Sequence, residues 1–119
     1  MKTDSRQAVL RYYTAVDNGD IDGLLTLFAS DAVYHRPGYE PLVGRADLEE
    51  FYLRQRVIDT GRHQVEFLLE DDSRVAVYGT FAGTLNDGTT VRIRFSDFFC
   101  LRDDGLFERR DTFFFLPAV

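Results

Sequence analysis

The sequence predicts an α+β domain in which helices come first and an antiparallel sheet follows. Apolar residues recur at helical spacing in the first half of the chain and alternate with polar residues after Gly61. Turn sequences divide the second half at Asp71-Asp72-Ser73, Asn86-Asp87-Gly88 and Asp103-Asp104-Gly105. With 119 residues and no linker or repeat, the chain is expected to form one domain, residues 1–119. A sheet of this kind, curled around a helix, makes a cone with an open mouth.

The first two predicted helices are short and amphipathic. Candidates for the N-cap of the first are Thr3, Asp4 and Ser5. Its apolar stripe comprises Val9, Tyr12 or Tyr13, and Val16. This helix ends at Asn18-Gly19, and Asp20 then caps a second helix that we expect to run from Ile21 to about Ala29.

A short strand and a third helix complete the first half. The strand covers Ala32–Arg36 and is stopped by Pro37-Gly38. A loop leads to Gly44, and the third helix is expected from Ala46 to about Ile58. Four longer strands follow, at Gln64–Glu70, Arg74–Leu85, Thr89–Leu101 and Leu106–Leu116. The last two turns between them suit tight hairpins with glycine at the position that needs a positive φ.

Asp97 is the leading candidate for a functional residue. Side chains alternate along its strand, so one face carries Val91, Ile93, Phe95, Asp97, Phe99 and Leu101. A carboxyl group on an apolar face must find partners or stay neutral through a raised pKa. Perturbed carboxyl groups in apolar clefts are candidate acids, bases or hydrogen-bond donors.

Composition and charge exclude several classes of function. The net charge of −6 and the lack of a broad basic patch argue against a nucleic-acid partner. Cys100 is the single cysteine, and the two histidines, His35 and His63, have no metal-ligand spacing, so we expect no disulfide, metal or cofactor. No stretch is long and apolar enough to cross a bilayer, and Met1-Lys2-Thr3-Asp4 does not open a signal peptide. We therefore expect a cytoplasmic protein with no membrane partner.

Three segments carry a resemblance to known proteins. They are Arg11-Tyr12 through Ile21, Gly44-Arg45 through Phe51-Tyr52, and the strand that holds Asp97. Through them the chain resembles ketosteroid isomerase and the wider nuclear transport factor 2-like superfamily, which includes SnoaL-like polyketide cyclases. The resemblance implies a curved antiparallel or mixed sheet wrapped around three N-terminal helices and closing over an apolar pocket. It also implies a homodimer that forms through the outer face of the sheet.

The resemblance extends to an oxyanion hole. The isomerases of this family use a tyrosine of the first helix and a protonated aspartic acid as donors, and a separate aspartate as base. By the resemblance, Tyr12 stands at the donor tyrosine, Asp97 at the neutral aspartic acid, and Tyr52 at a tyrosine that bonds to the donor. The base aspartate precedes a proline, where this chain has Arg36. Arginine cannot act as a base. Three alternatives follow: another residue of this chain is the base, the protein catalyses a different reaction, or the pocket binds a ligand without catalysis.

Asp111 and His35 are the candidates for a relocated base. If Asp103–Gly105 forms a three-residue loop, Asp97 lies opposite Asp111 at roughly 5 Å between Cβ atoms, and two such carboxyl groups cannot both ionise easily. A bulge at the loop glycine would shift this register by one. In SnoaL-like cyclases the two acid–base positions match Asp97 and Asp111, with histidine usual at the former. His35 suits a base at neutral pH, but it and Tyr34 point to opposite faces, and either could enter the pocket.

The remaining candidates are residues expected to bind the substrate. Besides Tyr52 they are Tyr34, His35, Arg36, Phe95 and Phe113. Arg36 could bind a carboxylate or an enolate oxygen. Purely structural interpretations stay open as well: Asp97 could pair with Arg109, and Asp111 could face solvent beside Arg92 or Arg94. The aromatic run at residues 113–115 could divide between the core and a dimer interface.

The sequence therefore predicts a cofactor-independent isomerase or cyclase that acts on a small apolar ketone- or polyketide-like compound. Tyr12 and Asp97 would bond to the enolate oxygen, and Asp111 or His35 would move the proton. One alternative is a non-catalytic module of the same fold that binds a small molecule or mediates oligomerisation. Another is an epoxide hydrolase-like activity. Relatives with that activity carry an Arg-x-Asp on the strand before the last hairpin, where this chain reads Arg74-Val75-Ala76.

Overall fold

Six strands form within residues 4–115, which are the residues that the structure, a computed structural model, describes. They are β1 (Phe28–His35), β2 (Leu42–Val43), β3 (Ile58–Asp71), β4 (Arg74–Leu85), β5 (Thr90–Leu101) and β6 (Phe107–Phe114). The helices are α1 (Ser5–Asp17), α2 (Ile21–Leu25) and α3 (Gly44–Glu50), and α3 continues into a π-helical turn, η1 (Phe51–Gln55). No helix in residues 4–115 is long and apolar enough to cross a membrane.

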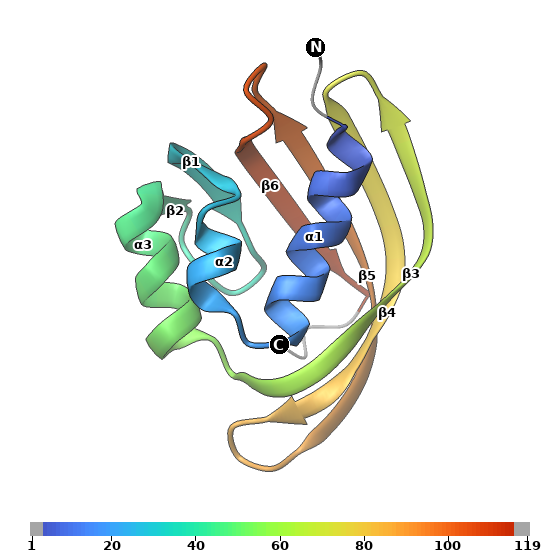
Figure 1. Ribbon diagram of the computed structural model, residues 1–119. Coiled ribbons are helices and arrows are strands. Elements are labelled where there is room, and N and C mark those ends of the chain that lie inside the picture. Colours follow the sequence, from blue (N-terminus) through green and yellow to red (C-terminus); the bar gives the residue numbers. More distant parts are fainter. Residues whose placement is uncertain (1–3, 116–119) are drawn as a thin grey trace.

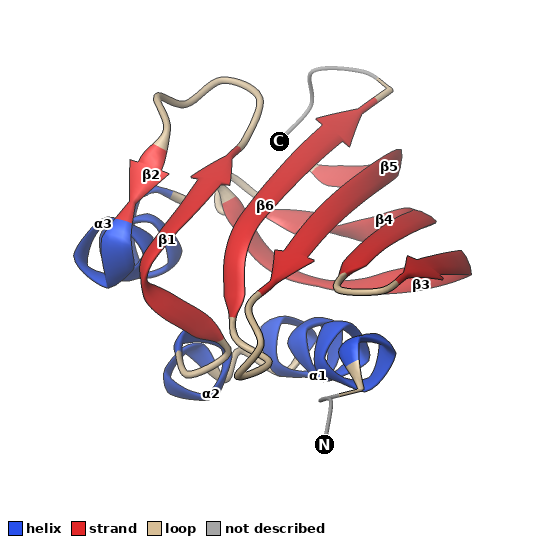
Figure 2. Ribbon diagram, turned by 90° about the horizontal axis from the view of Figure 1, so that it is seen from above, coloured by secondary structure: helices blue, strands red, loops and turns tan. Residues whose placement is uncertain are grey.

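All six strands belong to one curved sheet, in the order β2-β1-β6-β5-β4-β3. Neighbouring strands are antiparallel except β1 and β6, which run parallel, so the sheet is mixed. The helices lie on its concave side, with α1 under the β4–β5 region and α3 beside β1 and β2 (Figures 1 and 2). The predicted α+β architecture, a curved sheet wrapped around three helices, is confirmed.

Aromatic rings fill the space between α1 and the sheet. The Phe107 ring lies 5.2 Å from the Phe28 ring and 4.9 Å from the Phe99 ring, measured between centroids. Tyr12 of α1 packs edge-on against all three of these phenylalanines. Edge-to-face contacts of this kind stabilise a core beyond the area that they bury.

The predicted boundaries differ from the structure in the first half of the chain. The second helix ends at Leu25 rather than near Ala29, because Phe28 already pairs with Phe107 at the start of β1. The third helix stops at Gln55, and β3 begins at Ile58 rather than Gln64. The long partner strand β4 explains this extension, since it offers backbone partners along the whole of β3. The two-residue strand β2 was not predicted.

The predicted capping and turn chemistry is largely confirmed. Asp4 caps α1, because its carboxylate accepts a hydrogen bond from the Gln7 amide. Gly88 and Gly105 adopt φ angles of 89° and 85° in the last two hairpins. Two predicted features, the cap candidate Thr3 and the strand end at Leu116, lie outside the described residues.

The predicted pairing of Asp97 with Asp111 is wrong. An irregularity between Cys100 and Leu101 shifts the ladder by one residue, so Asp97 lies opposite Thr112, and Phe98 lies opposite Asp111. Because side chains alternate along a strand, this shift sends Asp111 to the outer face of the sheet.

We predict that Phe107→Ala will lower the free energy of unfolding by about 3–5 kcal/mol, because it leaves a cavity among the core rings. The control is Leu53→Ala, whose side chain is 52% exposed and whose change we expect to stay within about 0.5 kcal/mol. Urea denaturation of the two variants beside the wild type is the measurement. Equal losses in both variants would contradict the role given to Phe107.

Candidate functional site

An ion pair inside the cone is the centre of the site. Asp97 on β5 and Arg110 on β6 are 0% and 2% exposed. The guanidinium Nε donates to Asp97 Oδ1 at 3.2 Å, and Nη2 donates to Oδ2 at 2.9 Å. Asp97 also accepts from the Tyr13 hydroxyl at 2.5 Å and from the Thr112 hydroxyl. With these four bonds, the lone pairs of the carboxylate are largely used.

These contacts keep Asp97 ionised. Burial alone would raise its pKa, but the charge of Arg110 and the hydrogen bonds from Arg110, Thr112 and Tyr13 outweigh burial and hold the pKa below its usual value. The expectation that Asp97 is a neutral acid able to donate a hydrogen bond is therefore wrong, since an ionised carboxylate can only accept. Its partner is Arg110, not Arg109.

The third nitrogen of Arg110 serves two tyrosines. Nη1 donates to the Tyr12 hydroxyl at 2.5 Å and to the Tyr52 hydroxyl at 3.1 Å, and these hydroxyls lie 2.5 Å apart. The Tyr12–Tyr52 hydrogen bond that the resemblance implied is thus present. Burial raises the pKa of both tyrosines, so both are neutral at physiological pH. The guanidinium also lies over the rings of Tyr12 and Tyr34, at 4.5 Å from each centroid.

Tyr34 of β1 and Arg36, the residue that follows β1, point into the interior. Arg36 is 7% exposed, and its Nη1 donates to the Tyr34 hydroxyl at 2.8 Å. That hydroxyl lies 3.1 Å from the Thr112 hydroxyl, which joins Arg36 to the network around Asp97. The alternative left open by the sequence is thereby decided: Tyr34 faces inward and His35 outward.

His35 and Asp111 contact each other on the outer face of the sheet. His35 Nδ1 lies 2.7 Å from Asp111 Oδ1, and Arg109 Nη2 donates to Asp111 Oδ2 at 2.9 Å. Burial alone would raise the pKa of Asp111, but the hydrogen bonds and charges of Arg109 and His35 together outweigh burial and lower the pKa. Phe113, 55% exposed, also faces outward. The structure brings together Tyr12, Tyr34, Arg36, Tyr52, Phe95 and Asp97 inside the cone, and it leaves His35, Asp111 and Phe113 outside.

Sequence reasoning missed Arg110, Tyr13 and Thr112. Arg110 and Thr112 share a parity with the partly buried Phe114, which is a signal for one face of β6. The apolar residues Phe107, Phe113 and Phe115 instead indicate that the odd-numbered positions face inward. The ladder irregularity near Phe107 puts that residue on the inner face together with the even-numbered positions that follow.

A second polar pair, Asp17 and His63, was also missed. His63 Nδ1 lies 2.6 Å from Asp17 Oδ1, and the His63 amide donates to Asp17 Oδ2 at 2.8 Å. The imidazole lies among the rings of Tyr13, Phe81 and Phe95, with centroids 4.8–5.3 Å away. Burial lowers the pKa of His63, and Asp17 opposes this only in part, so the ring is neutral near pH 7.

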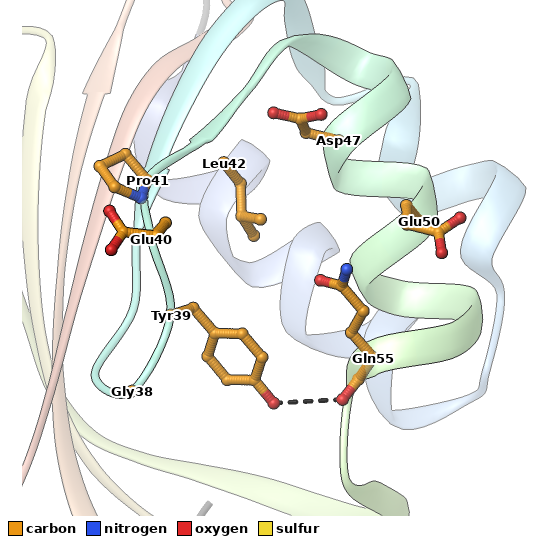
Figure 3. A pocket seen from close by; sticks show the side chains of 8 residues that line it. All are labelled: Gly38, Tyr39, Glu40, Pro41, Leu42, Asp47, Glu50 and Gln55. Atoms are coloured by element: carbon orange, nitrogen blue, oxygen red, sulfur yellow. Dashed lines mark hydrogen bonds between the residues drawn. The ribbon is translucent and has the colours of Figure 1, made fainter.

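A cavity of about 500 Å³ opens between the β1–β2 loop and α3 (Figure 3). Its lining residues are Gly38, Tyr39, Glu40, Pro41, Leu42, Asp47, Glu50 and Gln55. The Tyr39 hydroxyl donates to the Gln55 carbonyl at 3.1 Å across it. Three of the lining residues are acidic, but within residues 4–115 no group of three or more His, Cys, Asp or Glu side chains is arranged to hold a metal ion.

The fold is similar to that of solved nuclear transport factor 2-like proteins. An NTF2-like protein of unknown function from Burkholderia pseudomallei K96243 superposes with a TM-score of 0.84 at 20% identity, over 94% of this chain and 91% of that one. The model of the SnoaL-like domain matches residues 9–109. The chain therefore belongs to the SnoaL-like family.

Two further solved structures are similar over most of their length. TerC, co-crystallised with polyporic acid, is 27% identical with a TM-score of 0.80, over 92% of this chain and 90% of that one. SalBIII, an epoxide hydrolase/cyclase-like enzyme with a role in pyran ring formation in the polyether salinomycin, is 23% identical with a TM-score of 0.81. That match covers 92% of this chain and 89% of SalBIII.

We predict that Asp97→Leu will lower the free energy of unfolding by about 3–5 kcal/mol, because it leaves the Arg110 charge buried without a partner. Combining it with Arg110→Met should restore a large part of that loss, since both charges are then removed. Denaturant unfolding of the single and double variants measures the difference. A double variant no more stable than Asp97→Leu would show that the ion pair is not the source of the loss.

Proposed function

We propose that this protein is a cofactor-independent isomerase or cyclase that acts on a small apolar carbonyl compound through an enolate. The observation that carries the proposal is that the buried hydroxyls of Tyr12 and Tyr52 contact each other and both accept a hydrogen bond from the guanidinium group of Arg110. These polar groups are buried away from water, and a hydrogen-bond donor in such surroundings stabilises a developing oxyanion by about 3–4 kcal/mol.

The arrangement modifies the oxyanion hole of the isomerases. In this proposal Tyr52 donates its hydrogen to the Tyr12 hydroxyl, and Tyr12 donates to the enolate oxygen. The charge of Arg110, which donates to both hydroxyls, strengthens the Tyr12 donor. Asp97 acts as a positioning residue, because its two oxygens fix the guanidinium edge opposite the tyrosines. The donor that was expected from a neutral Asp97 is replaced by the Arg110–tyrosine group.

His63 is the proposed base, in place of the predicted Asp111 or His35. Asp17 occupies its Nδ1, which leaves Nε2 to accept a proton. The ring is next to Tyr13, whose hydroxyl bonds to Asp97, so the pair is continuous with the interior network. His35 and Asp111, by contrast, could serve only a reaction on the outer face of the sheet.

The relatives support small-molecule chemistry of this general kind. TerC was co-crystallised with polyporic acid, and SalBIII takes part in ring formation. The epoxide hydrolase alternative is weaker for this chain, because Arg74 is exposed and pairs with Asp71 at the end of β4. A non-catalytic binding module remains the second candidate, and it is favoured by the complete hydrogen bonding of Asp97.

We predict that the wild-type protein will catalyse exchange of the α-protons of a planar bicyclic ketone, 2-tetralone, with deuterium from D₂O. Tyr12→Phe should slow this exchange by about 10²-fold, because it removes one donor to the enolate. Proton NMR of the ketone measures the rate directly. Tyr78→Phe, on the opposite face of the sheet, is the matched control and should exchange at the wild-type rate.

The same assay distinguishes the candidate bases. His63→Gln should slow exchange by about 10²-fold or more, whereas His35→Gln should leave it unchanged. Slower exchange in His35→Gln, with an unchanged rate in His63→Gln, would show that the base lies on the outer face of the sheet. Absence of exchange above the buffer rate in the wild type would refute enolisation and favour the binding module.

We also propose that the protein forms a homodimer through the outer face of the sheet. The large apolar side chains exposed there are Phe67, Leu69, Phe98, Phe113 and Phe115, each 47–68% exposed. The Phe98 and Phe113 rings contact each other at 5.7 Å, which makes the surface continuous across β5 and β6. Exposed apolar patches of this kind are typical of interfaces.

We predict that Phe98→Asp will convert the dimer to a monomer, because it places a charge in the middle of the apolar face. Sedimentation velocity gives the oligomeric state. Leu53→Asp, a change of equal chemistry on η1, should leave the dimer intact. A wild-type monomer at high protein concentration would contradict the proposal.

A further inference from the structure

Arg36 has an unused guanidinium edge inside the protein. Its Nη1 donates to the Tyr34 hydroxyl, but Nε and Nη2 have no hydrogen-bond partner although both atoms are buried. Buried polar groups without partners are rare, and each calls for a physical explanation. Nε and Nη2 lie along one edge of the planar guanidinium group, and this edge can bind a carboxylate with two parallel bonds.

Arg110 demonstrates this use of the edge in the same protein. Its Nε and Nη2 hold the two oxygens of Asp97, and its Nη1 holds tyrosine hydroxyls. In Arg36, Nη1 likewise donates to a tyrosine hydroxyl, that of Tyr34, but Nε and Nη2 have no carboxylate to bind. The two arginines therefore differ in one element, a bound carboxylate group.

The charges around the tyrosines point to the same conclusion. Arg56 also has a buried Nε without a partner, and its guanidinium lies 6.0 Å from the centroid of the Tyr52 ring. Burial lowers the pKa of Arg56, and the positive charge of Arg36 acts in the same direction. Among residues 4–115, the guanidinium groups of Arg36, Arg56 and Arg110 all have buried nitrogens, and of these three only Arg110 pairs with a carboxylate, that of Asp97. A buried cation without a counter-charge is costly.

We propose that Arg36, assisted by Arg56, binds the carboxylate of an aromatic or other planar carboxylic acid. The rings of Phe51 and Phe114 lie 5.1 Å from the Arg36 guanidinium and offer flat apolar surfaces beside it. Phe51 also packs on Tyr39, which lines the cavity of Figure 3. As a statement about the substrate, this inference rests on the proposed function and narrows it to acidic carbonyl compounds.

Binding of 2-naphthoate tests the inference, with the uncharged amide 2-naphthamide as the matched probe. Wild-type protein should bind the acid, and Arg36→Met should bind it roughly 10- to 100-fold more weakly, as expected for the loss of a charge-assisted bidentate contact. Arg92→Met, on the outer face, should bind as the wild type does. Equal binding of acid and amide, or naphthoate binding that Arg36→Met does not weaken, would overturn the inference.

Thermal unfolding without ligand gives a second, independent test. Arg36→Met should unfold at the same temperature as the wild type or higher, because it removes a charge that lacks a partner. Arg110→Met should unfold at a lower temperature, because it leaves Asp97 unpaired. An equal decrease in both variants would mean that the Arg36 charge is already compensated, and the inference would fail.

The outcome is separable from that of the proposed function. Naphthoate binding that depends on Arg36, in a protein that exchanges no ketone protons, would uphold the carboxylate site and refute catalysis. Proton exchange that depends on Tyr12, without Arg36-dependent binding of naphthoate, would refute the carboxylate site and uphold catalysis.

Discussion

The ion pair between Asp97 and Arg110 joins β5 to β6 inside the cone and keeps a charged guanidinium group among aromatic rings. Because Asp97 satisfies one edge of Arg110, the remaining nitrogen can serve the hydroxyls of Tyr12 and Tyr52. Removal of the carboxylate would leave a buried charge, and removal of the arginine would leave the carboxylate among apolar groups. The tyrosines, the strands and the polarity of the interior therefore depend on one contact.

This contact also distinguishes the interior from a purely apolar pocket. Polar groups inside a protein interact strongly because little water screens them, but only groups with partners are stable there. The network around Asp97 is complete, whereas the edge of Arg36 is not. A preorganised binding site requires both features: a network with all hydrogen bonds formed, which keeps the site rigid, and polar groups that are free to bind a ligand.

The change from helical spacing to strand alternation predicted the α+β class, and the family resemblance implied the curved sheet around three helices. The burial of Asp97 followed from the alternation of side chains along its strand. The partner of Asp97 could not be predicted in the same way. A single irregularity beside Leu101 changes the register, and it exchanges Asp111 for Arg110 on the inner face. The same irregularity puts the odd-numbered Phe107 on the inner face together with the even-numbered Arg110 and Thr112. The position of Phe107 in the sequence therefore indicated the wrong inner face for β6. The Asp17–His63 pair depends on the packing of α1 against β3, which no local pattern in the sequence expresses.

The parallel pairing of β1 with β6 has a consequence for how the chain folds. β1 is made before its parallel neighbour β6, with β2, β3, β4 and β5 between them in the chain, so β1 pairs on that side only after all of these strands have emerged. Contacts so distant in sequence are slow to form, since a long loop must close first. The hairpins that join β3, β4, β5 and β6 have short turns and can assemble before that, so Arg110 can meet Asp97 in the β5–β6 hairpin. Tyr34, whose ring lies against the Arg110 guanidinium, reaches this ion pair only when β1 closes onto β6 in the final stage of folding.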